Sequence, residues 1–356
     1  MGERPREGKP ERLAALTRLR VLLIGWVLVY HLELPLRALA GIPVAERVAL
    51  KGYLGVDGFF VLSGFALYLG YRHRPPLGLR GWADFVRRRA ARIFPLHLAA
   101  LALLVAGAAT AGLRVNEPQR FGGWELLMQA LLLNAWETTD FHAWNYPSWA
   151  LSAIWAGYLA FPLVLTAMLG RGEAACWALA AACLGGLAWL GAGADGADLN
   201  RTLHLGLVRF GLEFLLGIAL ARLVVARAVA APLATGAALL LAPIGLWLTL
   251  DVLVVAGLAA LVARLGMAPP APRPPRDLLW RLGEASFGVY LCWIFVEAAL
   301  VLVLRLADPG QAGRLALMGI GLAATMLLGW LAWRLVEQPA ARLLEPIAAG
   351  RERPVA

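Results

Sequence analysis

Charged residues are scarce in this sequence. Asp, Glu, Lys and Arg make up 16% of its 356 residues, whereas hydrophobic residues make up 60%, and the mean hydropathy is +0.69. A single water-soluble core does not need so much apolar sequence, which excludes an ordinary soluble domain. Apolar runs of about 20 residues recur along the chain, and each is long enough to cross about 30 Å of hydrocarbon. The sequence therefore predicts an all-α integral membrane protein.

Cysteine and lysine are rare as well. The three cysteines, Cys176, Cys183 and Cys292, all fall inside apolar runs. Cys176 and Cys183 are about two helical turns apart on one predicted helix, too far for a disulfide, so we interpret the cysteines as small core residues. Abundant alanine, glycine and arginine beside so little lysine is a hint of a high-GC bacterial genome. We therefore expect a protein of the bacterial cytoplasmic (inner) membrane.

The apolar runs predict a bundle of about ten transmembrane helices, with both termini on one side. The first run is long and lacks a small-residue cleavage site, so no cleavable signal is expected. The sequence contains no internal repeat of the kind that would indicate a two-fold transporter fold. The eighth run is the least distinct, because only Asp251 and its neighbours separate it from the seventh. The predicted spans are approximately 19–40, 52–71, 93–112, 150–169, 174–194, 203–221, 231–249, 250–264, 282–304 and 314–335.

Arginine decides the expected orientation of the bundle. The formal net charge is +10, but the arginines lie at the ends of the apolar runs, as topology signals do, so no nucleic-acid partner is expected. Most of them fall on the face that holds the N-terminus, which predicts that both termini are cytoplasmic. The chain then divides into a basic tail (1–18), a transmembrane domain (19–344) with a proline-rich cytoplasmic linker (266–281), and a second cytoplasmic tail (345–356).

One outer segment does not fit the pattern of spans. Residues 123–136 (GWELLMQALLLNAW) are helical in pattern but too short to cross the membrane comfortably. Counting them as a span would invert every later loop and remove the arginine bias. We therefore expect residues 113–149 to form an extracytoplasmic segment, with this helix lying at the interface or re-entering it.

Two polar residues mark the first span. Arg20 and His31 are eleven residues apart, which is about three turns, so they share one face of the helix. At about 1.5 Å per residue, His31 lies about 16 Å from Arg20, near the middle of the membrane. An imidazole there costs free energy unless it is hydrated, paired or used in chemistry. A histidine that only bonds a neighbouring helix is an equally good interpretation.

The second span adds a carboxylate. Asp57 lies about five residues in from the outer face and could approach His31, where it would fix the imidazole tautomer and stabilise its cation. Glycines along the same span would let the two helices approach closely. Alternatively, Asp57 pairs with Lys51 or with an arginine, and the glycines serve packing alone.

Further charged residues lie at the ends and inside other spans. Arg89 and Arg92 share a helical face at the membrane edge, where arginine forks suit phosphate groups, although such a charge run is more often a cytoplasmic anchor. Arg209 and Glu213 are four apart in the sixth span and can form an ion pair, most simply a structural one. Glu297 lies in the apolar zone of the ninth span and needs a partner or water.

With these residues in view, the chain resembles membrane acyltransferase family three, the O-antigen and exopolysaccharide acetylase type, from about residue 13 to residue 344. Any one motif is weak, but seven in the family's order are specific. The motifs are Arg20 and His31 separated by ten residues, GVDGFFVLSGF (55–65), FVRRRAARIFPLH (85–97), PSWALSAIWAGYLAFP (147–162), RFGLEFLLG, SFGVYLCW and VEQPAARLL.

The resemblance implies a ten-helix bundle that takes an acyl group, with acetyl expected, from a cytoplasmic acyl-CoA. The group goes to a hydroxyl of a glycan or glycolipid on the outer face. In this interpretation His31 is the general base or a transient acyl carrier, and Asp57 supports it. The donor, expected to be acetyl-CoA, binds at Arg20, Arg89 and Arg92, and no metal takes part. The resemblance also implies substrate contact or structural support from Ser152, Tyr290, Arg209 and Glu213.

Two positions depart from the family pattern. Ile154 stands where the family usually has a glutamate, so Ser152 lacks its acidic companion, and Trp293 stands where the family often has a histidine. Isoleucine cannot bind a hydroxyl and tryptophan cannot accept a proton, so these changes bear on acceptor choice or on activity itself. Glu33 and Glu297 are the nearest candidates to compensate, by position alone.

We therefore predict an integral membrane O-acyltransferase whose partners are the lipid bilayer and a glycan or glycolipid acceptor. Two alternatives stay open. One is a non-catalytic carrier or flippase-like protein, and the other is an acyltransferase for a secreted small molecule such as a macrolide. An enzyme is favoured by the retained family residues, which are Arg20, His31, Asp57, Arg89 and Arg92. Ile154 and Trp293 weigh against it, but more weakly. The oligomeric state is open as well, with a homodimer as one option.

Overall fold

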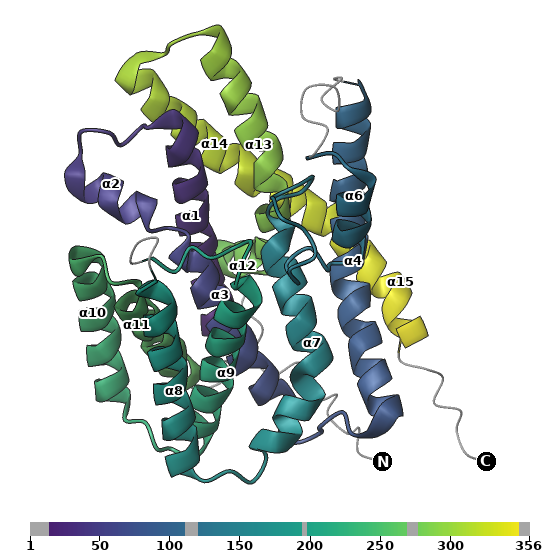
Figure 1. The fold of residues 1–356 in the computed structure, drawn as a ribbon, viewed down its shortest axis with the longest axis vertical. Helices are drawn as coiled ribbons and strands as arrows, with labels where there is room; N and C mark the ends of the chain where they lie inside the picture. Colours follow the sequence, from purple (N-terminus) through teal and green to yellow (C-terminus); the bar gives the residue numbers. More distant parts are fainter. Residues whose placement is uncertain (1–13, 111–119, 194–197, 269–276, 349–356) are drawn as a thin grey trace.

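The structure is a computed structural model that describes residues 14–110, 120–193, 198–268 and 277–348. These residues form a bundle in which most long helices lie side by side (Figure 1). No strand occurs among them, so the predicted all-helical fold is confirmed. Most of the predicted N-terminal tail, half of the proline-rich linker and the end of the C-terminal tail lie outside the described residues.

The helices keep their order along the chain. They are α1 (Ala14–Leu36), α2 (Pro43–Leu50), α3 (Leu54–Tyr71), α4 (Gly78–Thr110), α6 (Gly123–Ala130), α7 (Ser148–Met168), α8 (Glu173–Gly191), α9 (Gly206–Val225), α10 (Ala231–Leu248), α11 (Asp251–Gly266), α12 (Leu278–Glu284), α13 (Ser286–Leu306), α14 (Gly310–Ala332), the π-helical turn η2 (Trp333–Glu337) and α15 (Gln338–Ala348).

Eight helices in the described part of the chain are long and apolar enough to cross a membrane. They are α1, α3, α4, α7, α8, α10, α13 and α14 with its continuation to Leu344. The other two predicted spans are helical as well, but α9 carries Arg209, Glu213 and Arg222, and α11 has only 16 residues. Both pack against α3. The chain is thus an integral membrane protein, and the count of ten spans stays a prediction.

The centre of the bundle is the contact between α3 and α9. A Cβ atom added at Gly64 would collide with the backbone carbonyl of Phe214, and one at Gly217 with that of Val61. The two helices therefore touch through their backbones, an approach that small residues permit. This contact holds α9, with its charged residues, against the middle of α3.

The predicted close approach of α1 and α3 is confirmed. A Cβ atom at Gly55 would lie 2.6 Å from the carbonyl oxygen of Leu23, so glycine is needed at this crossing. At Gly52 the added atom would lie 2.8 Å from the Cβ atom of Tyr30. The start of α3 therefore lies beside the second half of α1. Because the two helices run in opposite directions, Arg20 lies toward the end of α3 and His31 lies toward its beginning.

The outer segment contains a shorter helix than the sequence predicts. α6 ends at Ala130, whereas the pattern continues to residue 136. The chain turns there through Leu132, whose φ of 56° is left-handed. The Ser152 hydroxyl donates to the Leu132 carbonyl at 2.7 Å and accepts from the Ala135 N–H at 3.1 Å. These tertiary bonds satisfy the backbone groups that a longer helix would have paired, which ends α6 early.

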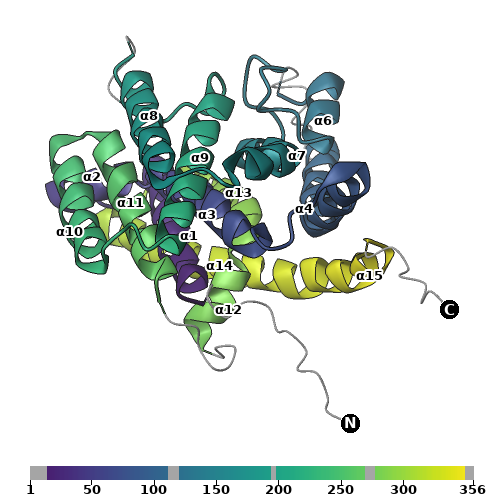
Figure 2. The ribbon, with the colours of Figure 1, turned by 90° about the horizontal axis from the view of Figure 1, so that it is seen from below.

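The helical path near the C-terminus is interrupted at two places. The first is the break at Ala285 between α12 and α13. It lies beside a crossing where a Cβ atom at Gly283 would collide with the Thr17 carbonyl of α1. α14 passes through η2 into α15, which extends away from the bundle (Figure 2). Pro339 cannot donate to the carbonyl four residues earlier, which favours a widened turn at this point. The widened turn includes the buried Glu337.

Candidate active site

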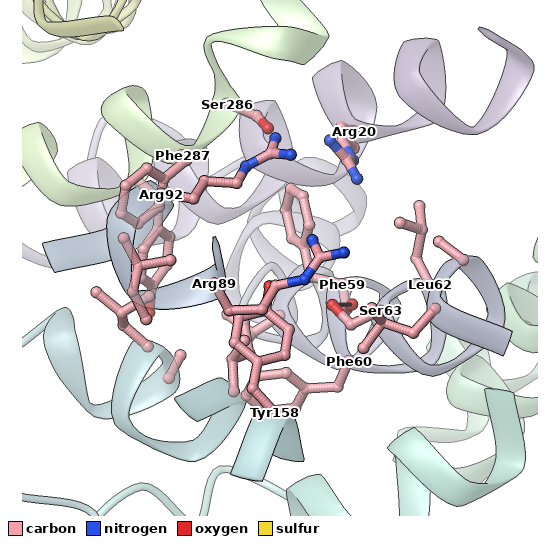
Figure 3. A pocket seen from close by; sticks show the side chains of 18 of the residues that line it. Arg20, Phe59, Phe60, Leu62, Ser63, Arg89, Arg92, Tyr158, Ser286 and Phe287 are labelled. Carbon is pink, nitrogen blue, oxygen red and sulfur yellow. Dashed lines mark hydrogen bonds between the residues drawn. The ribbon is translucent and has the colours of Figure 1, made fainter. Parts of the chain in front are cut away.

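Three arginines that are far apart in the sequence meet at one cavity. Arg20 comes from α1, Arg89 and Arg92 come from α4, and their guanidinium groups point into a space of about 480 Å³ (Figure 3). The arginines lie where α1 and α13 begin and α3 ends, which is the side that the predicted topology places in the cytoplasm, and the cavity extends from there along α3 as far as Val56. Guanidinium forks match phosphate oxygens, so this convergence forms a candidate anion site.

Aromatic side chains hold Arg89 in place. Its Nη2 donates to the Tyr71 hydroxyl at 3.0 Å, and its guanidinium carbon lies 5.3–5.5 Å from three ring centres. The three rings are those of Tyr71, Phe85 and Tyr158. Cation–π contacts restrict the arginine without neutralising it. Arg89 is therefore fixed in direction and keeps its charge for a ligand.

Arg92 and Arg20 differ in their acidic neighbours. The Nε atom of Arg92 lies 3.9 Å from Oε1 of Glu337, at the widened turn of η2. Arg20 has neither a hydrogen bond nor an ion pair with any other part of the chain that the structure describes. The charges of Glu284 and Glu337 both act on Arg20, so the three arginines outnumber two nearby carboxylates and the cavity presents positive charge to a ligand.

The rest of the cavity wall is mostly apolar. α3 contributes Phe59 and Phe60, and α7 contributes Ile154. The position at which the sequence departs from the usual glutamate is therefore on the cavity wall. Tyr290 also lines the cavity, and the Ser63 hydroxyl donates to the Phe59 carbonyl of its own helix at 2.8 Å. The cavity therefore has arginine side chains on one part of its wall and apolar side chains on the rest. This arrangement suits a ligand that has both an anionic and an apolar portion.

His31 lies beyond the cavity, among aromatic rings. Its imidazole stacks on the indole of Trp293, with ring centres 3.7 Å apart and an interplanar angle of 18°. The rings of Tyr30 and Tyr146 meet it edge-on at 4.9 and 6.0 Å. Within the described residues, no hydrogen bond reaches its ring nitrogens, and it does not line the cavity. Ring packing therefore orients this imidazole in place of a carboxylate.

Asp57 pairs with Arg209 instead of approaching His31. The Nε atom of Arg209 donates to one oxygen of Asp57 at 2.9 Å and Nη2 donates to the other, and both side chains are fully buried. The predicted contact with His31 is therefore wrong, and the alternative pairing with an arginine is observed. The reason is geometric, because Asp57 and Gly64 are two turns apart on the face of α3 that packs against α9.

The predicted pair of Arg209 and Glu213 is present as well. The Nε atom of Arg209 lies 3.7 Å from Oε1 of Glu213, and Glu213 is fully buried. Neither oxygen of Glu213 has a hydrogen bond. Two carboxylates thus share one guanidinium in the core, and its single positive charge can balance only one of them.

The remaining candidate residues have local partners or none. Ser152 lies outside the cavity and binds the backbone of the outer segment. The Glu33 carboxylate accepts from the Leu39 N–H at 3.0 Å, so it closes the turn after α1. No hydrogen bond or ion pair of Glu297 is found in the described ranges. The same ranges contain no group of three or more His, Cys, Asp or Glu side chains that could hold a metal ion.

Two histidines tie the outer segment to the loop before α9. The Nδ1 atom of His204 lies 2.8 Å from Oε2 of Glu137, and this hydrogen bond lowers the pKa of Glu137. The Nε2 atom of His142 lies 3.0 Å from the Thr202 hydroxyl. Burial lowers the pKa of His142 to about 4, with a smaller contribution from the charge of Arg120. His142 is therefore neutral at neutral pH.

Comparison with known proteins places this geometry in a family. The family model described as an acyltransferase domain matches residues 13–334. The chain belongs to acyltransferase family three. It is similar to "Acyltransferase MdmB" of Streptomyces mycarofaciens, with 31% identity over 345 residues that cover 87% of this chain and 85% of the relative. The chain matches no solved structure.

Membership in acyltransferase family three makes this protein a membrane acyltransferase. Several residues of its candidate site escaped the sequence analysis. Tyr30 and Tyr146 pack on His31, Tyr71 and Tyr158 hold Arg89, and Glu337 faces Arg92. Tyr30 precedes His31 directly, and Glu337 lies within VEQPAARLL, so both could have been suspected. Nothing in the local sequence signals the other contacts, because they join distant helices.

Proposed function

We propose that this family member is an O-acyltransferase that moves an acyl group, with acetyl expected, from acyl-CoA in the arginine-lined cavity to a hydroxyl presented from the opposite side. The acceptor is a glycan or glycolipid. The protein works in the bacterial cytoplasmic membrane, with both termini and the cavity on the cytoplasmic side. The convergence of Arg20, Arg89 and Arg92 on one cavity, with His31 on the same helix as Arg20, carries this proposal.

Charge and shape support acyl-CoA as the donor. Its phosphates are anionic, and three guanidinium groups face the cavity. The apolar wall of α3 and α7 suits the less polar arm that carries the thioester. Arg20 and His31 are about 16 Å apart along α1, so a ligand with an extended arm is needed to bring phosphates and reacting carbon to these two residues.

His31 is the group suited to move the proton. In the proposed reaction its neutral imidazole accepts the proton of the acceptor hydroxyl, and the oxygen attacks the thioester carbonyl carbon. The carbon–sulfur bond then breaks, an ester forms, and the coenzyme A thiolate leaves with the proton that His31 returns. Asp57 acts at a distance, since it holds Arg209 and with it the α3–α9 contact.

Binding and turnover of acetyl-CoA by the purified protein test this proposal. We expect free thiol to be released from acetyl-CoA, slowly with water as acceptor, and His31→Ala to abolish the release. Arg89→Ala should weaken acetyl-CoA binding by about 10- to 150-fold, because a charged hydrogen bond is worth about 1.5–3 kcal/mol. Arg87→Ala is the matched control, since Arg87 lies on the same helix, pairs with Asp84 and does not line the cavity.

Other outcomes would identify another function. Binding of acetyl-CoA with no thiol release in the wild type or in His31→Ala would favour the carrier. Equal turnover in His31→Ala would remove His31 from the reaction. Mass spectrometry of surface glycans and of secreted small molecules from a deletion strain would then identify the acceptor class.

A further inference from the structure

Trp293 covers one face of His31, and neither side chain lines the cavity. Tyr290 lines the cavity, and Trp293 follows it by one turn of α13, where its indole lies flat against the imidazole of His31 at 3.7 Å. Trp293 is only 2% exposed, and Tyr146 packs edge-on against it at 6.1 Å. One face of the imidazole is therefore covered by the indole, and His31 as a whole is 8% exposed.

In its stacked position on His31, Trp293 has a polar group without a partner. Its indole N–H is fully buried and donates no hydrogen bond. A buried donor left unpaired is unfavourable, because it has given up its hydrogen bond to water. This cost is removed when the indole turns to where water or a ligand oxygen can accept the bond. Ring packing therefore keeps the indole stacked on His31, although its N–H has no acceptor in this position.

We propose that Trp293 is a positioning residue that keeps the donor cavity apart from His31, and that it swings off the imidazole when the acyl group arrives. This role rests on the proposed acyl transfer. In the resting state water and acceptor on the outer side cannot meet a thioester on the inner side. Transfer then requires both the displaced indole and a hydroxyl at His31, which suppresses hydrolysis of the donor.

Two substitutions distinguish a gate, meaning an indole that moves off His31 to let the acyl group in, from a purely structural role of Trp293. Trp293→Ala removes the ring system that covers His31, whereas Trp293→Phe keeps one aromatic ring to cover the imidazole and loses the unpaired N–H together with the second ring of the indole. Trp189→Ala is the control for loss of a tryptophan, because Trp189 lies on α8 and is 73% exposed. Thermal unfolding of each variant in detergent establishes that it is folded.

The first measurement does not depend on catalysis. Diethyl pyrocarbonate modifies accessible imidazoles, and mass spectrometry of the peptide that contains His31 gives the rate. We expect Trp293→Ala to raise this rate by about tenfold, as for loss of a covering group worth about 1.4 kcal/mol, with Trp293→Phe and Trp189→Ala close to the wild type. An unchanged rate in folded Trp293→Ala would overturn the gate, whatever the activity.

The second measurement is thiol release from acetyl-CoA without an acceptor. Trp293→Ala should raise the rate of release about fivefold at saturation with an unchanged KM, because the arginines are untouched. Release at or below the wild-type rate from folded Trp293→Ala would overturn the gate and show that the indole only orients His31. If His31 becomes accessible but no form of the protein releases thiol, the proposed acyl transfer fails instead.

Discussion

The carboxylate of Asp57 on α3 and the guanidinium of Arg209 on α9 form a doubly hydrogen-bonded pair with no solvent exposure. Glu213 adds a second carboxylate 3.7 Å from the same guanidinium. Such a cluster is costly to break, because removal of one partner leaves the other buried and unpaired. It joins the two helices whose backbones touch at the centre of the bundle.

We predict an order of stability for variants of this cluster. Arg209→Gln should be the most destabilising, by about 3–5 kcal/mol, because it leaves two buried carboxylates without a cation. Asp57→Asn should cost less, since Arg209 keeps Glu213. The double variant should lose less than the sum of the two single losses. Chemical denaturation in detergent measures all three.

Asp57→Asn also separates support from chemistry. A variant that unfolds like the wild type but has lost turnover would place Asp57 in the reaction itself. We expect the opposite, with lower stability and partial turnover, because Asp57 contacts Arg209 and does not contact His31.

The backbone contact of α3 with α9 predicts a pair of matched variants. Gly64→Ala should destabilise the protein by about 1–3 kcal/mol, because the new methyl group meets the Phe214 carbonyl, which cannot move aside cheaply. Gly211→Ala, in α9, has nothing within 4 Å and should be neutral or stabilising by up to about 1 kcal/mol. Only the Gly64→Ala midpoint should fall below the wild-type value, and an equal loss of stability in both variants would contradict the packing.

The Tyr71 hydroxyl predicts a modest effect on the donor. Tyr71→Phe removes the hydrogen bond to Arg89 and should weaken acetyl-CoA binding about two- to tenfold, as for a bond worth about 0.5–1.5 kcal/mol. Tyr68→Phe is the control, because Tyr68 lies one turn earlier on α3 and does not line the cavity. Equilibrium binding of acetyl-CoA compares them, and equal affinities would separate Tyr71 from the donor site.

The outer segment should loosen in acid. The pKa of His142 lies at about 4 in the folded protein, below its usual value near 6.5, so the folded state favours the neutral imidazole. Its contribution is full above about pH 6.5 and is lost as the pH falls toward 4. Hydrogen exchange of residues 131–147, corrected for intrinsic rates, should rise over this range. His142→Asn should remove that rise, and the same rise in the variant would assign it to another group.

The sequence by itself determined the class of the protein and much of its first helix. Apolar runs too long and too frequent for a soluble core require a membrane, and helical periodicity places Arg20 and His31 on one face. The motif order also indicated the family. These are local properties, since they depend only on residue type and spacing along one helix.

Only the tertiary structure decided which side chains meet. The sequence allowed Asp57 to pair with His31, Lys51 or an arginine, and the α3–α9 contact selected Arg209. It marked Trp293 as a departure, but the stack on His31 depends on how α13 lies beside α1. The helix predicted to run to residue 136 stops at Ala130 because Ser152, on another helix, binds its backbone. Contacts between helices depend on which faces meet, and no periodicity within one helix specifies that.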